Sequence, residues 1–411
     1  MEPRFRPATM NRQASVRTLL IVSHVTHYRD RQTISAYGPY AREIDLWADL
    51  FDRVLVAAPL RREPPPTDCM AFTRSNIAMF PLPETGGESV RAKIVQVCFL
   101  PSLIKNLCKV MRTADAIHVR CPGNLGLLGA FLAPVFARPL VAKYAGQWNG
   151  YPGEPPTVRF QRALLRSRWW RGPVTVYGQW PQQPAKIIPF FTSILTEEQL
   201  ASAGKVARNK RCGEALHVLY VGRLSTSKNV DTLLEAVALV KNQGVRISGA
   251  VIGDGPERRR LEVRSKDLDL DLHVRFPGAM PFEQVLEFYE WADVLVLTSE
   301  TEGWPKAITE GMAFGLVCIG SDRGFVPQML AEGRGLVVSP RDVAALASAL
   351  NEIAIHPENF DRMRTAAAAW AQSYSLEGLR EALRDLLSRS WGVTLQVSEN
   401  RKDRQPAGVR T

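Results

Sequence analysis

The sequence has no hydrophobic run long enough to cross a bilayer. Its longest apolar stretch, residues 125–137, contains Pro134 and is shorter than the roughly 20 apolar residues that a transmembrane helix needs. The N-terminus is polar and arginine-rich, which does not match a secretory signal peptide. We therefore expect a cytoplasmic protein, or one attached peripherally to the inner face of the membrane.

Paired cysteines and metal-binding patterns are missing as well. The six cysteines are scattered without a CxxC pair, so we expect reduced thiols. His24 and His27 lack the glutamate of an HExxH zinc motif, and we expect them to shape the mouth of an acceptor site. Asp267, Asp269 and Asp271 form a DxDxD pattern in a connection between a predicted helix and strand. We expect no metal and no cofactor there or elsewhere.

Charge is unbalanced, with 52 Lys and Arg residues against 41 Asp and Glu residues and a formal net charge of +11. Such an excess indicates an acidic partner, and nucleic acid, anionic lipid and a diphosphate-bearing substrate all have the required charge. No nucleic-acid-binding motif accompanies the basic residues, so we expect no nucleic acid partner.

Short apolar runs alternate with amphipathic stretches in both halves of the 411 residues. The run LLIVSHV, the stretch REIDLWADLF and the run RVLVAAP predict strand, helix and strand, and a second such series begins at His217. This alternation predicts an α/β protein with two doubly wound, Rossmann-like parallel-sheet domains. The expected segments are a flexible basic leader (1–17), an N-terminal acceptor domain (18–200), a linker (201–215), a C-terminal donor domain (216–374), a C-terminal helix (375–395) and a disordered tail (396–411).

The strongest chemical signal follows the predicted strand 293–298, where the chain reads SETEGWPKAITEGMAFG. Seven residues separate Glu302 from Glu310, and Pro305 suits the start of a helix. Ligands of open α/β sheets bind at the carboxyl ends of the strands, and the N–H groups at a helix start attract anions. Carboxylates on either side can accept hydrogen bonds from sugar and ribose hydroxyls, although two glutamates alone would more often be solvated surface residues.

Further candidates follow the first strands of the second half. The strand HVLYVG ends at Gly222; Arg223 comes directly after it, and Lys228 follows five residues later, just before the next predicted helix. Two cations at the end of a strand can neutralise a departing diphosphate without a metal.

Two more strand ends carry glycines. The segment VIGDGPE places Gly253 and Gly255 in a tight turn that lets a ligand approach the backbone. The segment HVRFPG supplies Phe276 and Gly278, which suit the flank of a flat base.

In this order and spacing, GRLSTSK, VIGDGPE, VRFPG and ETEGWPKAITEGMAFGLVCIGSD resemble the GT-B glycosyltransferases of family 4, the E-x7-E retaining enzymes of glycosyl transferases group 1. The resemblance is strong over residues 216–350 and covers 18–200 in outline. It implies two domains facing a cleft, retention of anomeric configuration, an oxocarbenium-like transition state and no metal. It also implies a terminal helix that crosses back to the N-terminal domain, with hinges near 190–193 and Ser375.

The resemblance assigns roles to the donor-side residues. Glu310 would hold the nucleotide ribose and Glu302 the hydroxyls of the donor sugar, while Arg223 and Lys228 would bind the diphosphate. The backbone near Phe276 would meet the base. Backbone N–H groups at the helix start would face sugar and phosphate, and the residues expected there are Gly303, Trp304, Pro305, Lys306 and Ala307.

The N-terminal half departs from the family pattern. The usual Gly-Gly loop is replaced by HYRDRQTISAYGPYAREID, in which Gly38 takes the place near the phosphates and a helix starts near Pro39. The family's histidine near the reacting sugar falls in AIHVRCPGN, where Arg120 occupies its place and His118 stands two residues earlier. Either Arg120 donates hydrogen bonds to sugar or phosphate, or His118 serves from a shifted register. The remaining alternative is a core histidine and a surface arginine without a role at the site.

A basic, aromatic stretch, RFQRALLRSRWWRG, runs from Arg159 to Gly172. Such a stretch can lie against an anionic membrane surface. A solvated helix with a structural tryptophan pair would have the same sequence pattern.

The favoured hypothesis is a hexosyl-type glycosyltransferase that uses a UDP- or GDP-sugar and a glycan, lipid-linked or small-molecule acceptor, as in polysaccharide biosynthesis. A sugar-nucleotide epimerase of the same architecture is one alternative. A catalytically silent binding scaffold is the other.

Overall fold

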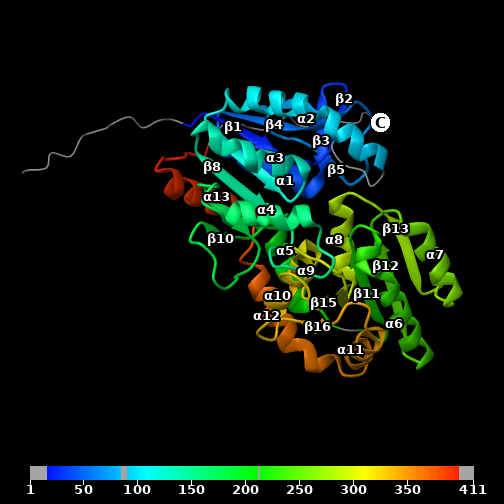
Figure 1. Cartoon of the computed structure of the whole chain (residues 1–411). Helices are drawn as coiled ribbons and strands as arrows, with labels where there is room; N and C mark the ends of the chain where they lie inside the picture. The colour runs from blue at the N-terminus through cyan, green and yellow to red at the C-terminus, as the bar shows by residue number, and fades with distance from the viewer. Residues whose placement is uncertain (1–15, 85–89, 212, 398–411) are drawn as a thin grey trace, which may run out of the picture.

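The computed structural model describes residues 16–84, 90–211 and 213–397, with only the backbone described for 90–98. It contains two α/β domains, one above the other in Figure 1, and each is built on its own sheet. The predicted fold class is therefore confirmed. Residues 1–15 of the predicted basic leader and residues 398–411 of the predicted tail lie outside the described residues.

The N-terminal sheet has the order β10-β9-β8-β7-β1-β4-β2-β3-β5, with β6 beside β4. All pairings are parallel except β2 with β3 and β3 with β5. Its strands are β1 (Thr18–Val22), β2 (His27–Asp30), β3 (Thr33–Tyr37), β4 (Arg53–Arg61), β5 (Cys69–Ala71), β6 (Ile77–Leu82), β7 (Ala116–Cys121), β8 (Leu140–Tyr144), β9 (Val174–Val176) and β10 (Ile187–Pro189). Its helices are α1 (Gly38–Leu50), α2 (Val90–Met111), α3 (Asn124–Leu132), η1 (Ala133–Phe136) and α4 (Pro156–Arg166).

The C-terminal sheet is parallel throughout, in the order β13-β12-β11-β14-β15-β16. This is the 3-2-1-4-5-6 order of a doubly wound domain, whose switch point lies between the first and fourth strands. The strands are β11 (Leu216–Val221), β12 (Ile247–Ile252), β13 (Val274–Gly278), β14 (Val294–Leu297), β15 (Val317–Ser321) and β16 (Leu336–Val338). The helices are η2 (Thr226–Lys228), α6 (Val230–Asn242), α7 (Arg258–Asp267), α8 (Phe282–Trp291), α9 (Lys306–Ala313), α10 (Val326–Leu330), α11 (Val343–Ile355), η3 (Pro357–Phe360) and α12 (Asp361–Ala371).

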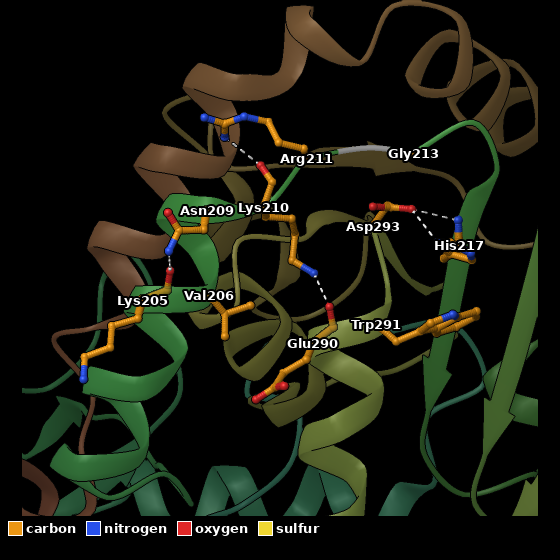
Figure 2. A pocket seen from close by; sticks show the side chains of 10 residues that line it. All are labelled: Lys205, Val206, Asn209, Lys210, Arg211, Gly213, His217, Glu290, Trp291 and Asp293. Atoms are coloured by element: carbon orange, nitrogen blue, oxygen red, sulfur yellow. Dashed lines mark hydrogen bonds and ion pairs between the residues drawn. The ribbon is translucent and has the colours of Figure 1, made fainter.

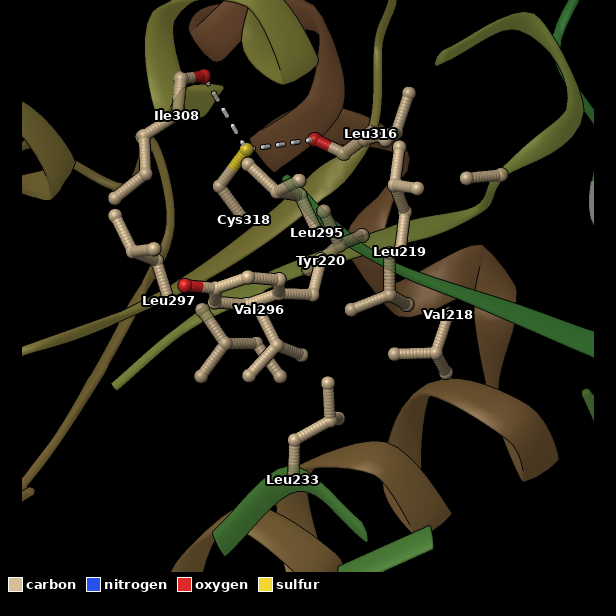
Figure 3. Packing of buried hydrophobic residues seen from close by; sticks show 14 of the residues in the cluster. Val218, Leu219, Tyr220, Leu233, Leu295, Val296, Leu297, Ile308, Leu316 and Cys318 are labelled. Carbon is tan, nitrogen blue, oxygen red and sulfur yellow. Dashed lines mark hydrogen bonds between the residues drawn. The ribbon is translucent and has the colours of Figure 1, made fainter. Parts of the chain in front are cut away.

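The core of the second domain fixes the three elements that carry the donor-side candidates. Figure 3 shows side chains of β11, such as Leu219, packed with side chains of β14, such as Leu295, and with Ile308 of α9. The buried Cys318 thiol donates to the Ile308 carbonyl at 3.6 Å. Strands β11 and β14 and helix α9 therefore share one apolar core.

The predicted linker is wrong over residues 201–209, which belong to helix α5 (Glu197–Asn209). Thr196 and Gln199 form a capping box at its start, and Leu200 and Ala203 are buried against the second domain. The polar, basic composition that suggested a linker is that of the exposed face of this helix.

The last helix, α13 (Leu376–Trp391), returns to the N-terminal domain (Figure 1). Leu379, Leu383 and Leu387 belong to the core that surrounds β1 and α1. The indole of Trp391 donates to the Leu140 carbonyl at 3.1 Å. The chain thus leaves the second domain after Tyr374, and its last described helix packs on the first.

None of the helices in the described ranges combines the length and the apolar character that crossing a bilayer requires.

Replacing Leu387 with Ala should lower the free energy of unfolding, because the side chain is fully buried and its removal leaves a cavity. The expected loss is about 2–5 kcal/mol. Urea unfolding followed by circular dichroism measures it. Ser390→Ala, at an exposed position of the same helix, is the control and should stay within about 0.5 kcal/mol of wild type. Equal stability of the two variants would show that α13 is not packed as described.

Candidate active site

The two strongest donor-side candidates meet at the carboxyl edge of the second sheet. The Lys228 ammonium lies 2.5 Å from a carboxylate oxygen of Glu302. Lys228 ends η2, which follows β11, and Glu302 lies in the loop between β14 and α9. Both side chains are largely covered. A cation and a carboxylate from separate sequence motifs therefore form one ion pair.

Asn229 holds these two loops together. It adopts a left-handed backbone conformation (φ 48°) directly after Lys228. Its side-chain amide donates to the Thr298 carbonyl at 2.9 Å and to Glu300 at 3.1 Å. The sequence reasoning passed over this residue, although an asparagine between a 3-10 turn and a helix is typical of this conformation.

Glu310 lies inside α9, where its side chain is buried and accepts a hydrogen bond from the Tyr289 hydroxyl at 2.7 Å. Its other oxygen has no partner among the described residues. Burial raises the pKa of Glu310 to about 7, and the Tyr289 hydrogen bond and the charge of Lys306 only partly oppose this rise. The free oxygen can accept a hydrogen bond from a hydroxyl group.

Arg223 is exposed, and no described residue accepts a hydrogen bond from its guanidinium. Its carbonyl accepts from the Tyr220 hydroxyl at 3.0 Å, which fixes the backbone after β11. The side chain is thus a cation whose position is open to a ligand.

Packing of the backbone explains the glycines of the VIGDGPE segment. Gly253 has φ 128°, and an added Cβ would lie 2.0 Å from the Gly222 carbonyl oxygen. Gly255 has φ 156°, and its added Cβ would lie 2.2 Å from the Leu224 carbonyl oxygen. The neighbouring strand end by itself accounts for these glycines, and the approach of a ligand to them stays a prediction.

The segment around Phe276 is also engaged within the domain. Its carbonyl accepts from Arg258 at 3.3 Å, and its ring packs partly against the core. Gly278 has φ 91°, and a Cβ there would lie 2.8 Å from the Arg258 guanidinium. Arg258 therefore lies where the sequence reasoning expected a base to meet this backbone.

The helix start differs from the prediction at one residue. Pro305 is the N-cap of α9 and has no N–H group, so it cannot donate to a sugar or a phosphate. The first N–H groups of the helix belong to Lys306 and Ala307, and no described residue accepts from them, as helix geometry leads one to expect. Gly303 lies two residues before Pro305 and close to the first domain. A Cβ added to Gly303 would lie 3.0 Å from the backbone of Gly146.

The Trp304 side chain is buried between the domains. Its ring stacks on Phe325 at 5.1 Å and on Trp370 at 5.9 Å, and it meets Tyr374 edge-on at 5.2 Å. The first domain contributes Tyr177, whose ring centroid lies 5.9 Å away. Of Trp304, only the backbone is available to a donor.

Three charged side chains converge on the other side of this boundary. Glu43 of α1 lies 3.2 Å from Arg120 of β7 and 2.8 Å from Lys143 of β8. Burial alone would raise the pKa of Glu43, but Lys143 and then Arg120 hold it well below its usual range. Sequence reasoning found only Arg120, because Glu43 and Lys143 stand in unremarkable helical and strand contexts.

The remaining N-terminal candidates are corrected. His118 is fully buried and stacks on Trp47 at 4.5 Å, and burial lowers its pKa to about 3, so it is a core residue. His27 is equally buried and does not line an acceptor mouth. The Gly38 N–H donates to the Asp68 carbonyl at 2.8 Å and is not free for a phosphate. His24, in contrast, is exposed after β1.

A pocket of about 590 Å³ opens at the opposite edge of the second sheet (Figure 2). His217 lies 3.1 Å from Asp293, and its ring packs on Trp291 at 4.6 Å. The Lys210 ammonium donates to the carbonyls of Glu290 and Ala292. It therefore places a cation at the C-terminal end of α8, where the helix dipole favours positive charge. This pocket therefore lies at the strand starts, away from the ion pair of Lys228 and Glu302.

Comparison with known proteins favours one of the alternatives for the second domain. Residues 206–370 match the family described as glycosyl transferases group 1. The match covers the second domain and the end of α5, which together are less than half of the chain. The group 1 match includes both glutamates of the E-x7-E motif and the cations after β11, and an epimerase is not favoured.

Relatives of the group 1 domain have names that refer to sugar transfer. The chain is 30% identical over 187 residues to a protein of Salmonella typhimurium named as a colanic acid biosynthesis glycosyltransferase, covering 43% of this chain and 46% of that one. It is 31% identical over 218 residues to D-inositol 3-phosphate glycosyltransferase of Streptomyces griseus, covering 49% and 44%. The chain thus matches less than half of the length of these relatives.

Solved structures show the fold of most of the chain. The crystal structure of Anabaena HepE in complex with UDP and glucose aligns with this chain at a TM-score of 0.66 and 17% identity. The alignment covers 91% of this chain and 99% of HepE. Sucrose-phosphate synthase of Thermosynechococcus elongatus has a TM-score of 0.69 at 20% identity, covering 92% and 99%. The group 1 domain and the domain before it together form a GT-B fold.

Glu310→Gln should change how stability depends on pH. The raised pKa means that folding favours the protonated carboxyl, so the wild type gains stability from this group below pH 4.5 and loses it as the pH rises through about 7. The variant has no such loss. Between pH 5 and pH 8, the difference in free energy of unfolding between the two proteins should shift by up to about 3 kcal/mol in favour of the variant. Urea titrations at both pH values measure this shift, and a constant difference would contradict the buried position of Glu310.

Proposed function

We propose that the chain is a retaining hexosyltransferase that moves a sugar from a UDP- or GDP-sugar to a hydroxyl group of a glycan, lipid-linked or small-molecule acceptor, without a metal cofactor. The ion pair of Lys228 with Glu302, set beside the start of α9, carries this proposal. The names of the group 1 relatives support it.

The proposed chemistry uses the carboxyl edge of the second sheet. Lys228, the exposed Arg223 and the first N–H groups of α9 would stabilise the negative charge that develops on the departing diphosphate. Glu302 would orient the donor ring through its hydroxyls, and the free oxygen of Glu310 would accept from a ribose hydroxyl. The acceptor hydroxyl would then attack from the face that the diphosphate leaves.

Two relatives suggest the setting of this reaction. Besides the colanic acid protein, the chain is 31% identical over 153 residues to an amylovoran biosynthesis glycosyltransferase of Erwinia amylovora. We propose polysaccharide biosynthesis as the process and the cytoplasm, or the inner face of the membrane, as its place.

Lys228→Ala should lower turnover of the cognate nucleotide sugar roughly 100- to 1,000-fold, since one electrostatic contact to a developing charge is typically worth about 3–4 kcal/mol. The donor is first found by thermal unfolding with UDP, GDP, ADP and their sugars, where a ligand at 100 times its Kd stabilises by about 2.7 kcal/mol. Lys205→Ala, at an exposed position on α5, is the matched control and should keep wild-type turnover.

The outcomes of this experiment separate the hypotheses. Nucleotide binding with transfer to an acceptor supports the proposal, and formation of an epimeric nucleotide sugar would indicate an epimerase. Binding without any turnover would indicate a silent scaffold. Near-normal turnover in Lys228→Ala would remove the proposed mechanism.

We also propose that the stretch from Arg159 to Gly172 contacts an anionic membrane. Trp170 is buried in the core, whereas Trp169 is 41% exposed and stacks on Phe131, which is 52% exposed. Arg162 pairs with Glu154 and is structural. Other arginines and an apolar side chain of the stretch remain exposed: Arg159, Phe160, Arg168 and Arg171. Exposed aromatic rings beside cations match the chemistry of an anionic lipid surface.

Binding to sedimenting vesicles tests this contact. The wild type should bind vesicles of phosphatidylcholine with phosphatidylglycerol and not vesicles of phosphatidylcholine alone. Changing Arg168 and Arg171 together to Gln should weaken binding by at least tenfold, because each cation near the surface is worth about 1 kcal/mol. Leu272→Ser, which removes a 92% exposed apolar side chain from the second domain, is the control. Unchanged binding in the double variant would contradict the contact.

A further inference from the structure

Two buried cations at the boundary between the domains share a single carboxylate. Arg120 and Lys143 are direct neighbours in the register of β7 and β8, near the carboxyl ends of both strands. Both reach Glu43 of α1, at 3.2 Å and 2.8 Å. The exposed fractions of these side chains are 12% for Arg120, 6% for Lys143 and 2% for Glu43. The cluster therefore holds two positive charges and one negative charge under little water.

Nothing else in the described chain neutralises the second positive charge. The ring of Tyr40 lies 5.1 Å from the Arg120 guanidinium, and the ring of Tyr177 lies 5.7 Å from the Lys143 ammonium. A ring face attracts a cation but carries no net charge. Arg120 donates to Glu43 through one terminal nitrogen, and its other N–H groups donate to no described residue. A buried charge without a counter-ion is costly, so the site suits an added anion.

The cluster faces the proposed donor site. Tyr177, which flanks Lys143, also contacts Trp304 at 5.9 Å, two residues after Glu302. Gly303 approaches the backbone of Gly146 just after β8, and an added Cβ there would lie 3.0 Å away. The excess charge of the first domain thus lies against the loop that carries Glu302, while the diphosphate candidates Arg223 and Lys228 follow β11 of the other domain.

A third cation adds to the imbalance. Lys306 is the first residue of α9, next to the Glu302 loop. Burial lowers the pKa of Lys306, and the positive charges of Lys143 and Arg120 add to this effect although Tyr177 and Glu43 oppose it. The boundary therefore concentrates positive charge from both domains.

We propose that Arg120 and Lys143 bind a second anionic group of the substrate, a carboxylate or a phosphate, in addition to the donor diphosphate. The inference rests on the proposed glycosyl transfer. The anion has two possible sources, which are the carboxylate of a transferred uronic acid and a phosphate on the acceptor. Both present the planar or tetrahedral oxygen groups that a guanidinium binds with several N–H groups at once.

The experiment compares Arg120→Gln with wild type by isothermal titration calorimetry. Glutamine keeps an amide that can donate to Glu43 but removes the charge. The first arm titrates UDP, UDP-glucose and UDP-glucuronic acid, or GDP, GDP-mannose and GDP-mannuronic acid if GDP is the nucleotide that binds. The second arm titrates inorganic phosphate at a saturating concentration of that nucleoside diphosphate. Arg53→Gln is the matched control, because Arg53 is exposed and lies at the amino end of β4, at the opposite end of the strands from the cluster.

A donor carboxylate predicts that wild type and Arg53→Gln bind the uronic acid donor at least tenfold more tightly than the neutral donor, and that Arg120→Gln loses this preference. An acceptor phosphate predicts phosphate binding that only Arg120→Gln weakens at least tenfold. In both cases the variant should bind the nucleoside diphosphate as wild type does.

Two results would overturn the inference. One is the absence of both a carboxylate preference and phosphate binding in wild type. The other is a tenfold loss of nucleoside diphosphate affinity in Arg120→Gln, because the cluster would then serve the diphosphate itself. If no nucleotide binds wild type at all, the proposed function fails first, which keeps the two failures distinguishable.

Discussion

Adjacent parallel strands must end at the same edge of a sheet, and the candidate site depends on this constraint. Strands β11 and β14 are neighbours, so the loops that follow them meet although more than 70 residues of chain separate Lys228 from Glu302 (|i−j| = 74). Asn229 then ties the loops together through the Thr298 carbonyl. The ion pair, the start of α9 and the position of Glu310 all follow from that adjacency. Without it, the motifs would be unrelated pieces of sequence.

The fold and the donor side could be predicted because their signals are local in sequence. Alternating apolar runs specify strands and helices, and the E-x7-E segment places both glutamates around one helix start. Two local signals were misread. The capping box of Thr196 and Gln199 marks a helix where composition suggested a linker, and Pro305 lacks the N–H group that its position was expected to supply. Both corrections were available from the residues themselves.

The charged cluster of the first domain could not be predicted in the same way. Glu43, Arg120 and Lys143 come from a helix and two strands, and each is ordinary in its own segment. Their meeting is a result of tertiary packing, which pattern and spacing do not encode. The same holds for His118, whose place on the strand face left open whether it pointed to a ligand or to Trp47. Only the position of α1 decides between these alternatives.

The surroundings of Trp304 have a mechanical consequence. Trp304 lies two residues after Glu302. Its ring packs against Trp370 and Tyr374, which precede the crossing of the chain to the first domain, and against Tyr177 of the first domain. A rotation of one domain relative to the other must therefore strain or repack these rings, and the Glu302 loop moves with them. The position of the Glu302 loop and the angle between the two domains are therefore mechanically coupled.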